Sequence, residues 1–443
     1  MLSPADAALV ARDPAIPGLA VLLDPEAFAL ALRSAAPDAQ LGAVEPMYVR
    51  YKPGTNCLVA YRVILPAGPT TVYARAYAEA LRHKLAHAAR LRDEPGAIGV
   101  GGMVLDASGI AVYSWPYDPE LRPMARLTRP RRRARLLASI CPARDDLAEA
   151  ALVHLRYRPE RRYVGRLVGA ARGDALLKIY CAGDYEQARA AAGAFRPAGP
   201  LDLAAPLASA DDLRAMLFAW RPGRALASLI RDDAGDLGAL RLAGAALATL
   251  HAQPAEGLPR AVAATPSADL AAAAASVAAI CPGLAPRVGW LAAGLAATLE
   301  AAPPAARPLH GDFYADQVLV GNGQATLLDL DNARWGDPAA DLGTFIAHLL
   351  RGVTLGRGTT AHAHALARAL CEGYAEVAPP PAPEQIGRYS ALGLLRLAPE
   401  PFRYRAPAWP AQVAALVAAA EDALAGEPGR RPLRAHARGG WHG

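Results

Sequence analysis

The chain has 443 residues and carries 47 lysine and arginine residues against 41 aspartate and glutamate residues, a net charge of +6. This length is enough for two or three domains with cores of their own. Hydrophobic residues make up 53% of the chain, but much of this is alanine, and no window has the roughly 18 strongly apolar residues of a membrane span. Five scattered cysteines without C-x-x-C spacing, and a start without the features of a signal peptide, predict a cytoplasmic protein with reduced thiols.

Arginine clusters at residues 129–135, 158–162 and 430–438 raise the alternative of a nucleic-acid-binding protein. No aromatic interleaving and no known binding motif accompany them, so solvated helix faces and a disordered tail are the interpretation that we favour. Steep salt dependence of DNA or RNA binding would support the alternative. We therefore expect neither a membrane nor a nucleic-acid partner, and the sequence leaves the oligomeric state open.

The first third of the chain contains short stretches that recur further on. The matching pairs are residues 50–53 with 156–159, residues 72–77 with 175–180, and residues 111–116 with 216–221. Arg75 of the first copy stands where Lys178 stands in the second. The repetition predicts that residues 42–135 are a second copy of a β-rich unit. Chance similarity is the alternative, and the loop-like Gly54-Thr55-Asn56 keeps open a reversal of the roles of the two copies.

The predicted elements of the second copy are a pair of strands around a turn at residues 156–166 and strands at 175–180 and 216–220. Beyond them, alanine- and leucine-rich segments with helical spacing predict helices within residues 226–250, 270–299, 386–397 and 413–424. Apolar runs at 317–320 and 325–328 flank Gly321-Asn322-Gly323. Such a turn between two apolar runs is a strong signal of a β-hairpin.

Two acidic motifs flank this hairpin. His310-Gly311-Asp312 precedes it and Asp329-Leu330-Asp331 follows it. Phosphoryl transfer needs one carboxylate beside the reacting hydroxyl and another beside a metal ion. Together with Leu250-His251 and residues 335–343 (WGDPAADLG), this order of motifs resembles the aminoglycoside phosphotransferase/choline kinase family, which has a protein-kinase-like fold. The alternative is that these aspartates only form turns and helix caps.

The resemblance implies an α+β, bilobal fold, with an antiparallel-sheet N-lobe and a mainly helical C-lobe, preceded by an extra N-lobe-like domain. We expect a degenerate N-lobe-like cap domain at residues 1–140 and a nucleotide-binding N-lobe at 145–222. A helical catalytic C-lobe is expected at 223–426 and a disordered tail at 427–443.

The resemblance also implies roles for individual residues. Asp312 would act as the base toward the acceptor hydroxyl, with His310 and Asp341 bracing its loop. The expected metal ligands are Asp329 for Mg²⁺, Gln317 in place of the family's asparagine, and Asp331 as either a second ligand or a structural acceptor. Lys178 is expected to contact the ATP phosphates, with Glu186 as its partner and Asp184 as the rival. Arg162 or Arg161 would cover the phosphates, and the main chain of Ala219 and Trp220 would contact adenine.

The sequence therefore predicts a kinase that uses ATP and Mg²⁺ to phosphorylate a hydroxyl of a small molecule: an aminoglycoside, a sugar or an amino alcohol. ATP against GTP, and the identity of the acceptor, are left open. Gln317 has a stem one methylene longer than asparagine, and metal sites are sensitive to displacements of about 1 Å. A pseudokinase that binds a nucleotide or a partner without transfer is thus the alternative.

Overall fold

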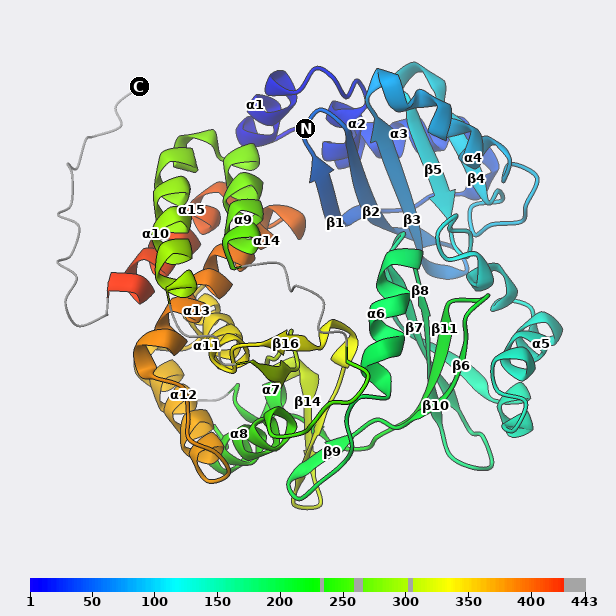
Figure 1. Ribbon diagram of the computed structural model, residues 1–443. Helices are drawn as coiled ribbons and strands as arrows, with labels where there is room; N and C mark the ends of the chain where they lie inside the picture. The colour runs from blue at the N-terminus through cyan, green and yellow to red at the C-terminus, as the bar shows by residue number, and fades with distance from the viewer. Residues whose placement is uncertain (232–234, 259–265, 302–305, 426–443) are drawn as a thin grey trace.

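The computed structural model describes residues 1–231, 235–258, 266–301 and 306–425, so the expected tail at 427–443 lies outside the described residues. A first β-rich lobe lies at the top of Figure 1, a second lies at the right, and helices fill the left and lower parts. No helix of these four described segments is long and apolar enough to cross a membrane.

The first lobe is a five-stranded antiparallel sheet with strand order β1-β2-β3-β5-β4. Its core side contacts three N-terminal helices, and Phe28 of α3 stacks on Tyr61 of β2 with ring centroids 4.0 Å apart. The elements are α1 (Pro4–Arg12), α2 (Leu19–Leu23), α3 (Pro25–Ala35), β1 (Val44–Lys52), β2 (Asn56–Leu65), β3 (Gly68–Tyr77), α4 (Ala86–Ala89), β4 (Gly102–Leu105) and β5 (Ile110–Ser114). The next helix, α5 (Pro130–Ile140), packs in the core of the second lobe.

The second lobe repeats this topology. Its strand order is β6-β7-β8-β11-β10, so in both sheets a three-stranded meander is followed by helix and by a hairpin that pairs with the third strand. The elements are β6 (Ala151–Arg158), β7 (Arg162–Val168), β8 (Ala175–Tyr180), α6 (Ala182–Ala192), β10 (Pro206–Ala210) and β11 (Ala215–Ala219). Arg75 of β3 and Lys178 of β8 each lie two residues before the tyrosine that ends the strand. The repeat read from the sequence is therefore also a repeat of strand order.

The predicted hairpin is formed by β14 (Val318–Gly321) and β15 (Gln324–Leu327). Asn322 and Gly323 both have positive φ, 51° and 73°, as the two central residues of a type I′ turn require. Strands β12 (Arg224–Ala225) and β9 (Leu201–Leu203) complete this sheet in the order β12-β14-β15-β9. Nearby, β13 (Arg307–Leu309) pairs with β16 (Arg334–Gly336). The hairpin thus brings the segment after the first acidic motif and the start of the second acidic motif together at the open end of one small sheet.

Helices make up most of the remaining chain. Two predicted helical segments are each broken in two: 226–250 into α7 and α8, and 270–299 into α9 and α10, where Pro282 cannot continue the hydrogen bonding of a helix. The bounds are α7 (Leu226–Leu229), α8 (Leu237–His251), α9 (Pro266–Ile280), α10 (Ala285–Glu300), α11 (Ala339–Thr354), α12 (Thr360–Ala375), α13 (Pro383–Leu397), α14 (Glu400–Arg403) and α15 (Trp409–Ala425).

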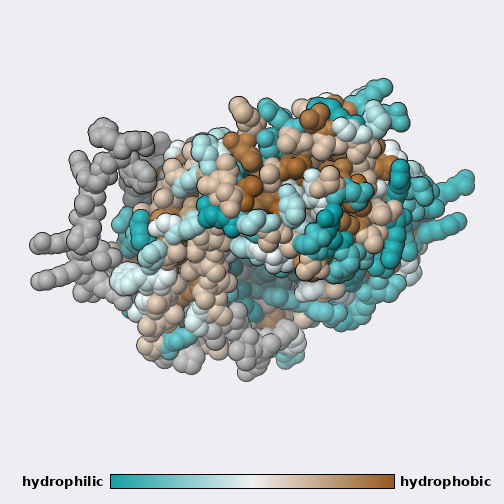
Figure 2. Space-filling model, turned by 90° about the horizontal axis from the view of Figure 1, so that it is seen from above, coloured by the Kyte–Doolittle hydropathy of each residue, from teal (hydrophilic) through white to brown (hydrophobic). Residues whose placement is uncertain are grey.

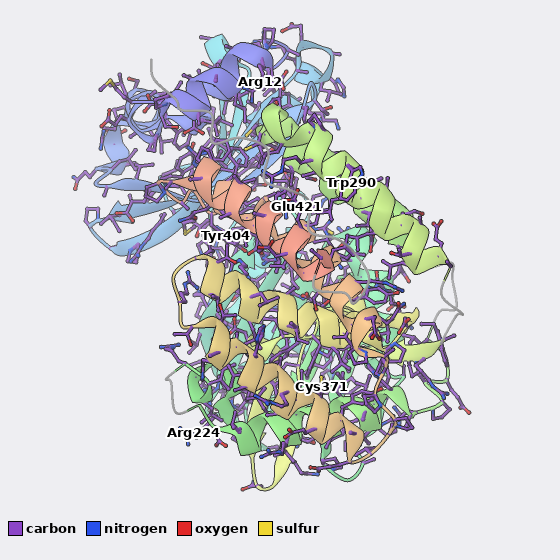
Figure 3. The ribbon with its side chains drawn as sticks, turned by 90° about the vertical axis from the view of Figure 1, so that its left-hand side faces the viewer. Arg12, Arg224, Trp290, Cys371, Tyr404 and Glu421 are labelled. Atoms are coloured by element: carbon purple, nitrogen blue, oxygen red, sulfur yellow. The ribbon has the colours of Figure 1, made fainter. Side chains whose placement is uncertain are left out.

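The larger of the two apolar clusters of the first lobe is shared with the helical part of the chain, whereas a smaller cluster around Tyr73 and Tyr113 lies within the lobe. One apolar cluster runs from its helices and sheet into α9, α10, α13 and α15. At this junction Arg12 donates a hydrogen bond to the carbonyl of Ile280 (3.3 Å), Arg405 pairs with Asp6 (2.7 Å), and Tyr404 packs on Tyr48. Arg12 and Tyr404 mark the two sides of the junction in Figure 3. The first lobe therefore shares its larger core with helices from the far end of the chain.

The top of the molecule, where the first lobe lies, carries apolar residues gathered between hydrophilic ones (Figure 2). Leu30 of α3 is 67% exposed there. In the second lobe, Lys178 of the third strand, β8, forms an ion pair with Asp329 of the helical lobe. The candidate active site lies at this contact between the two lobes.

Candidate active site

A short loop between β13 and the hairpin carries Asp312. Gly311 has φ 84°, and a Cβ added there would lie 2.1 Å from the carbonyl oxygen of Asn332. Only glycine therefore fits beside the segment that follows Asp331. Asp341 in the first turn of α11 is 1% exposed and accepts hydrogen bonds from the backbone amides of His310 (2.7 Å) and Gly311 (2.9 Å). One buried carboxylate thus fixes the loop that presents Asp312.

Two histidines complete this bracing. His251, buried at the end of α8, donates from Nε2 to Asp341 (3.0 Å), and its Nδ1 meets the hydroxyl of Tyr374 (3.0 Å). Burial favours the neutral form of Asp341, but the hydrogen bond and charge of His251 outweigh it and keep the pKa of Asp341 below its usual value. His310 donates from Nε2 to the carbonyl of Leu328 (2.8 Å), so its Nδ1 accepts from the amide of Asp312 (3.3 Å). Both ring nitrogens of His310 are therefore occupied by main-chain bonds.

The carboxylate of Asp312 is half-buried. In the described part of the chain, no side chain or amide donates a hydrogen bond to it. Burial raises the pKa of Asp312; the charge of Asp329 acts in the same sense, whereas His310, Arg396 and Arg158 act against it. A carboxylate that is raised in pKa and free of internal donors can accept a proton from a hydroxyl group.

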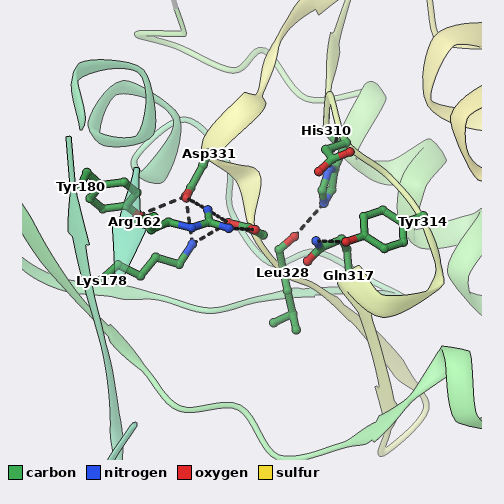
Figure 4. A network of polar contacts seen from close by, with 10 residues as sticks. Arg162, Lys178, Tyr180, His310, Tyr314, Gln317, Leu328 and Asp331 are labelled. Carbon is green, nitrogen blue, oxygen red and sulfur yellow. Dashed lines mark hydrogen bonds and ion pairs between the residues drawn. The ribbon is translucent and has the colours of Figure 1, made fainter. Parts of the chain in front are cut away.

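Asp329 and Asp331 converge on two cations (Figure 4). Arg162, at the start of β7, makes a bidentate pair with Asp329 (2.7 and 2.8 Å) and also contacts Asp331. The ammonium of Lys178 lies 2.7 Å from Asp329 and 3.0 Å from Asp331. Tyr180, two residues further along β8, donates to Asp331 (3.2 Å). Asp329 has φ 61°, a left-handed conformation that aspartate tolerates better than most residues.

The two carboxylates differ in their protonation tendencies. Burial works to raise the pKa of Asp329, but Lys178 and Arg162 outweigh it and hold that pKa well below its usual range. The pKa of Asp331 is raised by burial and by the charge of Asp329, against the opposing charge of Lys178. Asp329 is therefore the firmly ionised member of the pair, as a metal ligand must be.

The predicted ion pair between Lys178 and Glu186 is not formed. Glu186 is exposed on α6, where it points away from the buried ammonium of Lys178, and the rival Asp184 pairs with Arg161 at 3.2 Å. Lys178 is 7% exposed, and within the described residues its ionic partners are Asp329 and Asp331. The reason is packing: residue 186 falls on the outer face of α6, whereas Tyr185 and Ala188 face the sheet.

Gln317 directly precedes β14, the first strand of the hairpin. Its side-chain amide donates to the hydroxyl of Tyr314 (3.1 Å), while its main chain bonds Leu328 (2.8 Å). The Tyr314 ring stacks on His348 with centroids 4.2 Å apart. Burial and then the charges of Arg351 and Arg396 lower the pKa of His348 to about 4, so this imidazole is neutral. Gln317 thus keeps its amide oxygen free of these bonds, as a ligand role would require.

A cavity of about 760 Å³ lies between the second lobe and the helical lobe. Its walls include Lys178, Gln317, Asp329, Asp331, Arg162, Ala219 and Trp220; Asp312 and Glu186 are not among its lining residues. The amide of Ala219 donates to Ala205 (2.9 Å) and that of Trp220 to Asp174 (3.1 Å). Because both amides already donate hydrogen bonds within the protein, the predicted main-chain contacts to adenine would come from the carbonyl oxygens of Ala219 and Trp220. Arg166 stacks over the Trp220 ring at 4.0 Å and walls this end of the cavity.

The donor set suits Mg²⁺, which prefers carboxylate and amide oxygens and keeps open positions for phosphate. Asp329 and Asp331 already converge on one guanidinium, which shows that both can face one cation. No group of three or more histidine, cysteine, aspartate or glutamate residues forms a metal cage within the described ranges. A metal held by two carboxylates would therefore be completed by ligand oxygens.

Sequence reasoning missed three contributors: Tyr180, which donates to Asp331, and the stacked pair Tyr314 and His348. Tyr180 had a signal in the repeat, since Tyr77 ends the matching strand of the first copy. His348 had none, because its meeting with Tyr314 depends on how α11 packs against the loop.

Residues 162–380 match the sequence family described as the phosphotransferase enzyme family. No curated protein matches the chain. The fold is similar to that of a choline/ethanolamine kinase family protein from Mesorhizobium loti (20% identity, 65% of this chain and 95% of that chain, TM-score 0.45). It is also similar to that of the amicoumacin kinase hAmiN in complex with AMP-PNP, Ca²⁺ and Ami (13%, 65% and 92%, 0.47).

A third similar structure is a thermostable mutant of aminoglycoside phosphotransferase APH(4)-Ia with AMP-PNP and hygromycin B (17%, 63% and 94%, 0.47). Because each of these TM-scores is below 0.5, the likeness to the phosphotransferase enzyme family rests on the sequence match of residues 162–380. The expected α+β architecture, with antiparallel sheets followed by a mainly helical part of the chain, is confirmed.

Proposed function

We propose that this chain, whose residues 162–380 match the phosphotransferase enzyme family, transfers the γ-phosphoryl group of ATP to a hydroxyl of a small molecule. The observation that carries the proposal is one cavity of about 760 Å³ that brings Lys178, Asp329, Asp331 and the strand ending at Ala219 together. Phosphoryl transfer depends mainly on positioning and on charge stabilisation, and these residues supply both.

Each residue has a stated part in the proposed reaction. Asp312 takes the proton of the acceptor hydroxyl while the acceptor oxygen bonds to the γ-phosphorus and the bond to the β,γ-bridging oxygen breaks, releasing ADP. Lys178 holds phosphate oxygens by charge, in place of its present contacts with Asp329 and Asp331. Bound to Asp329 and Asp331, Mg²⁺ would neutralise charge that develops on the phosphates. His310 and Asp341 hold the Asp312 loop in register.

The charges around Asp312 bear on the acceptor. Arg158 and Arg396 both act electrostatically on Asp312, and Arg156 acts on the neighbouring Tyr314. Neither Arg156 nor Arg396 has an ion-pair partner among the described residues. These arginines repel a cationic acceptor whereas the carboxylates of Asp312 and Asp316 attract one, so the charges leave the aminoglycoside, the sugar and the amino alcohol all open.

The alternative of a nucleotide- or partner-binding protein without transfer activity is supported by one observation. Arg162 and Lys178 together satisfy both Asp329 and Asp331. In a pseudokinase this arrangement would persist with nucleotide bound and would exclude the metal. In an active enzyme, Mg²⁺ and ATP would release both cations from the carboxylates.

A thermal-shift titration with ATP, with and without Mg²⁺, tests the proposal on wild type beside Lys178→Ala and Asp329→Ala. A ligand that binds only the folded state stabilises it by about 2.7 kcal/mol at a hundredfold excess over its dissociation constant. We expect wild type to shift with Mg-ATP, and both variants to shift much less. ADP release over a panel of alcohols then identifies the acceptor. A shift equal with and without metal would favour the pseudokinase, and no shift would contradict nucleotide binding.

A further inference from the structure

The turn that joins β6 to β7 in the second lobe inserts a side chain into the first lobe. Glu160 in this turn has φ 58° and is 8% exposed. Its carboxylate lies 2.5 Å from Arg50 of β1 and 2.5 Å from Arg75 of β3. Arg75 also donates to the side-chain oxygen of Asn56 at 3.0 and 3.2 Å. A left-handed, buried glutamate between two arginines is costly unless the neighbouring structure fixes it.

The main chain of the same turn is fixed as well. The amide of Glu160 donates to Asp118 (2.7 Å), and Tyr157 donates to the same carboxylate oxygen (2.8 Å). Asp118 is 4% exposed and comes from the segment after β5 of the first lobe. It is itself held by the amide of Glu120 at 2.9 Å. The first lobe therefore binds both the side chain and the backbone amide of Glu160 in this turn.

Two residues after Glu160, the turn ends in Arg162, which faces the carboxylates of the catalytic lobe. The turn is thus tied at Glu160 to the first lobe and at Arg162 to Asp329. In the proposed ATP complex this turn covers the phosphates. These two anchors set its position along the cavity, because a turn held at both ends loses little further backbone entropy when a ligand binds.

The repeat explains why a carboxylate, that of Glu160, lies at the first of these two anchors. Arg75 stands at the strand position that Lys178 holds in the second lobe, and in both lobes the cation at this position binds carboxylate. The first lobe therefore keeps an anion-binding position, and its occupant is Glu160 of the neighbouring lobe. The two copies therefore differ in role, because Arg75 of the first copy is already paired with Glu160 and is not available to bind a phosphate.

We propose that the first lobe is a positioning device for the turn Pro159–Arg162, in which Arg50, Arg75 and Asp118 hold Glu160 so that the turn lies over the phosphates of bound ATP. This inference rests on the proposed function, because it names what the turn covers. Glu160 and Arg75 are then positioning residues: they touch no substrate, yet they set where Arg162 and the turn amides lie. Removing either partner leaves a buried charge without its counter-ion and frees the turn.

The test separates binding of phosphate from binding of the base. Dissociation constants for Mg-ATP and for adenosine, which lacks phosphates, are measured by calorimetry on the full chain. Variants are Glu160→Gln, Arg75→Met and Arg75→Lys. Asp6→Asn is the matched control, because it breaks another buried ion pair of the first lobe, with Arg405, that lies away from the turn. Melting curves verify folding, and Arg50→Met, which removes one arginine of two, replaces any variant that does not fold.

We expect Glu160→Gln and Arg75→Met to weaken Mg-ATP binding about tenfold, the equivalent of about 1.4 kcal/mol, and to leave adenosine binding unchanged. Arg75→Lys should restore most of the Mg-ATP affinity, and Asp6→Asn should alter neither constant. Equal losses for ATP and adenosine, or an effect of Asp6→Asn as large as that of Glu160→Gln, would overturn the positioning role in favour of general loosening. A wild-type chain that binds no Mg-ATP would overturn both proposals before any variant is compared.

Discussion

The bracing of the catalytic loop by Asp341 gives a prediction whose size follows from the contacts. In Asp341→Asn, the amide oxygen can replace the carboxylate oxygen that accepts from His310 and His251 (2.7 and 3.0 Å). The NH₂ group then faces the amide of Gly311, which donated to the other oxygen at 2.9 Å. A buried unsatisfied donor costs about 1–3 kcal/mol, and each bond that loses its charge loses about 1 kcal/mol. The free energy of unfolding should fall by about 4 kcal/mol.

Urea unfolding followed by intrinsic fluorescence measures this loss, with Asp337→Asn as the control. Asp337 also accepts two hydrogen bonds, from Ala339 (2.9 Å) and Gln385 (3.0 Å), but it is less buried. The pH dependence supplies a second check. The pKa of Asp341 is depressed in the folded state, so its contribution is present above its unfolded pKa of about 3.9 and is lost as the pH falls through the folded value. Wild type and Asp341→Asn should therefore converge in acid. A loss no larger than that of Asp337→Asn would refute the reasoning.

Three further predictions concern the chemistry. Asp312→Asn should lower acceptor-dependent ADP release by roughly 10²–10⁴-fold while Mg-ATP binding, measured by calorimetry, stays unchanged; undiminished release would exclude Asp312 as the base. Turnover of wild type should rise with pH through a pKa above that of an ordinary carboxyl group, because burial raises the pKa of Asp312. In Arg396→Met the rise should move to higher pH, and an unmoved profile would argue against Asp312 as the titrating group. Arg162→Met should be stabilised by Mg²⁺ alone more than wild type in thermal shift, because the guanidinium no longer competes for Asp329; equal shifts would argue against a shared site.

Features of the site that depend on local chemistry could be predicted from the sequence. The hairpin at residues 318–327 follows from Asn322-Gly323, whose positive φ values few other residue pairs adopt. The strand Ala175–Tyr180 has the bounds that its apolar run indicated. The repeated strand order followed from short matching stretches, because similar stretches at similar spacing form similar meanders. The order of Asp312, hairpin and Asp329 then placed both carboxylates on one small sheet.

The partners of buried charges could not be predicted in this way. Lys178 pairs with Asp329 across 151 residues, and Glu186 is excluded because its position on α6 faces outward. Arg162 lies between the two carboxylates only because β7 starts beside the catalytic lobe.

The sequence by itself determined the repeated β-rich units, the hairpin and the order of the acidic motifs, since each depends on backbone preferences over a few residues. Tertiary structure decided that Glu160 is buried in the first lobe and that the core of this lobe continues into α9, α10, α13 and α15. Those contacts join segments far apart in the chain, such as Glu160 and Arg75 across 85 residues, and their geometry depends on how whole lobes pack. A charged side chain takes the counter-charge that packing brings within reach, and no pattern along the chain specifies which one that will be.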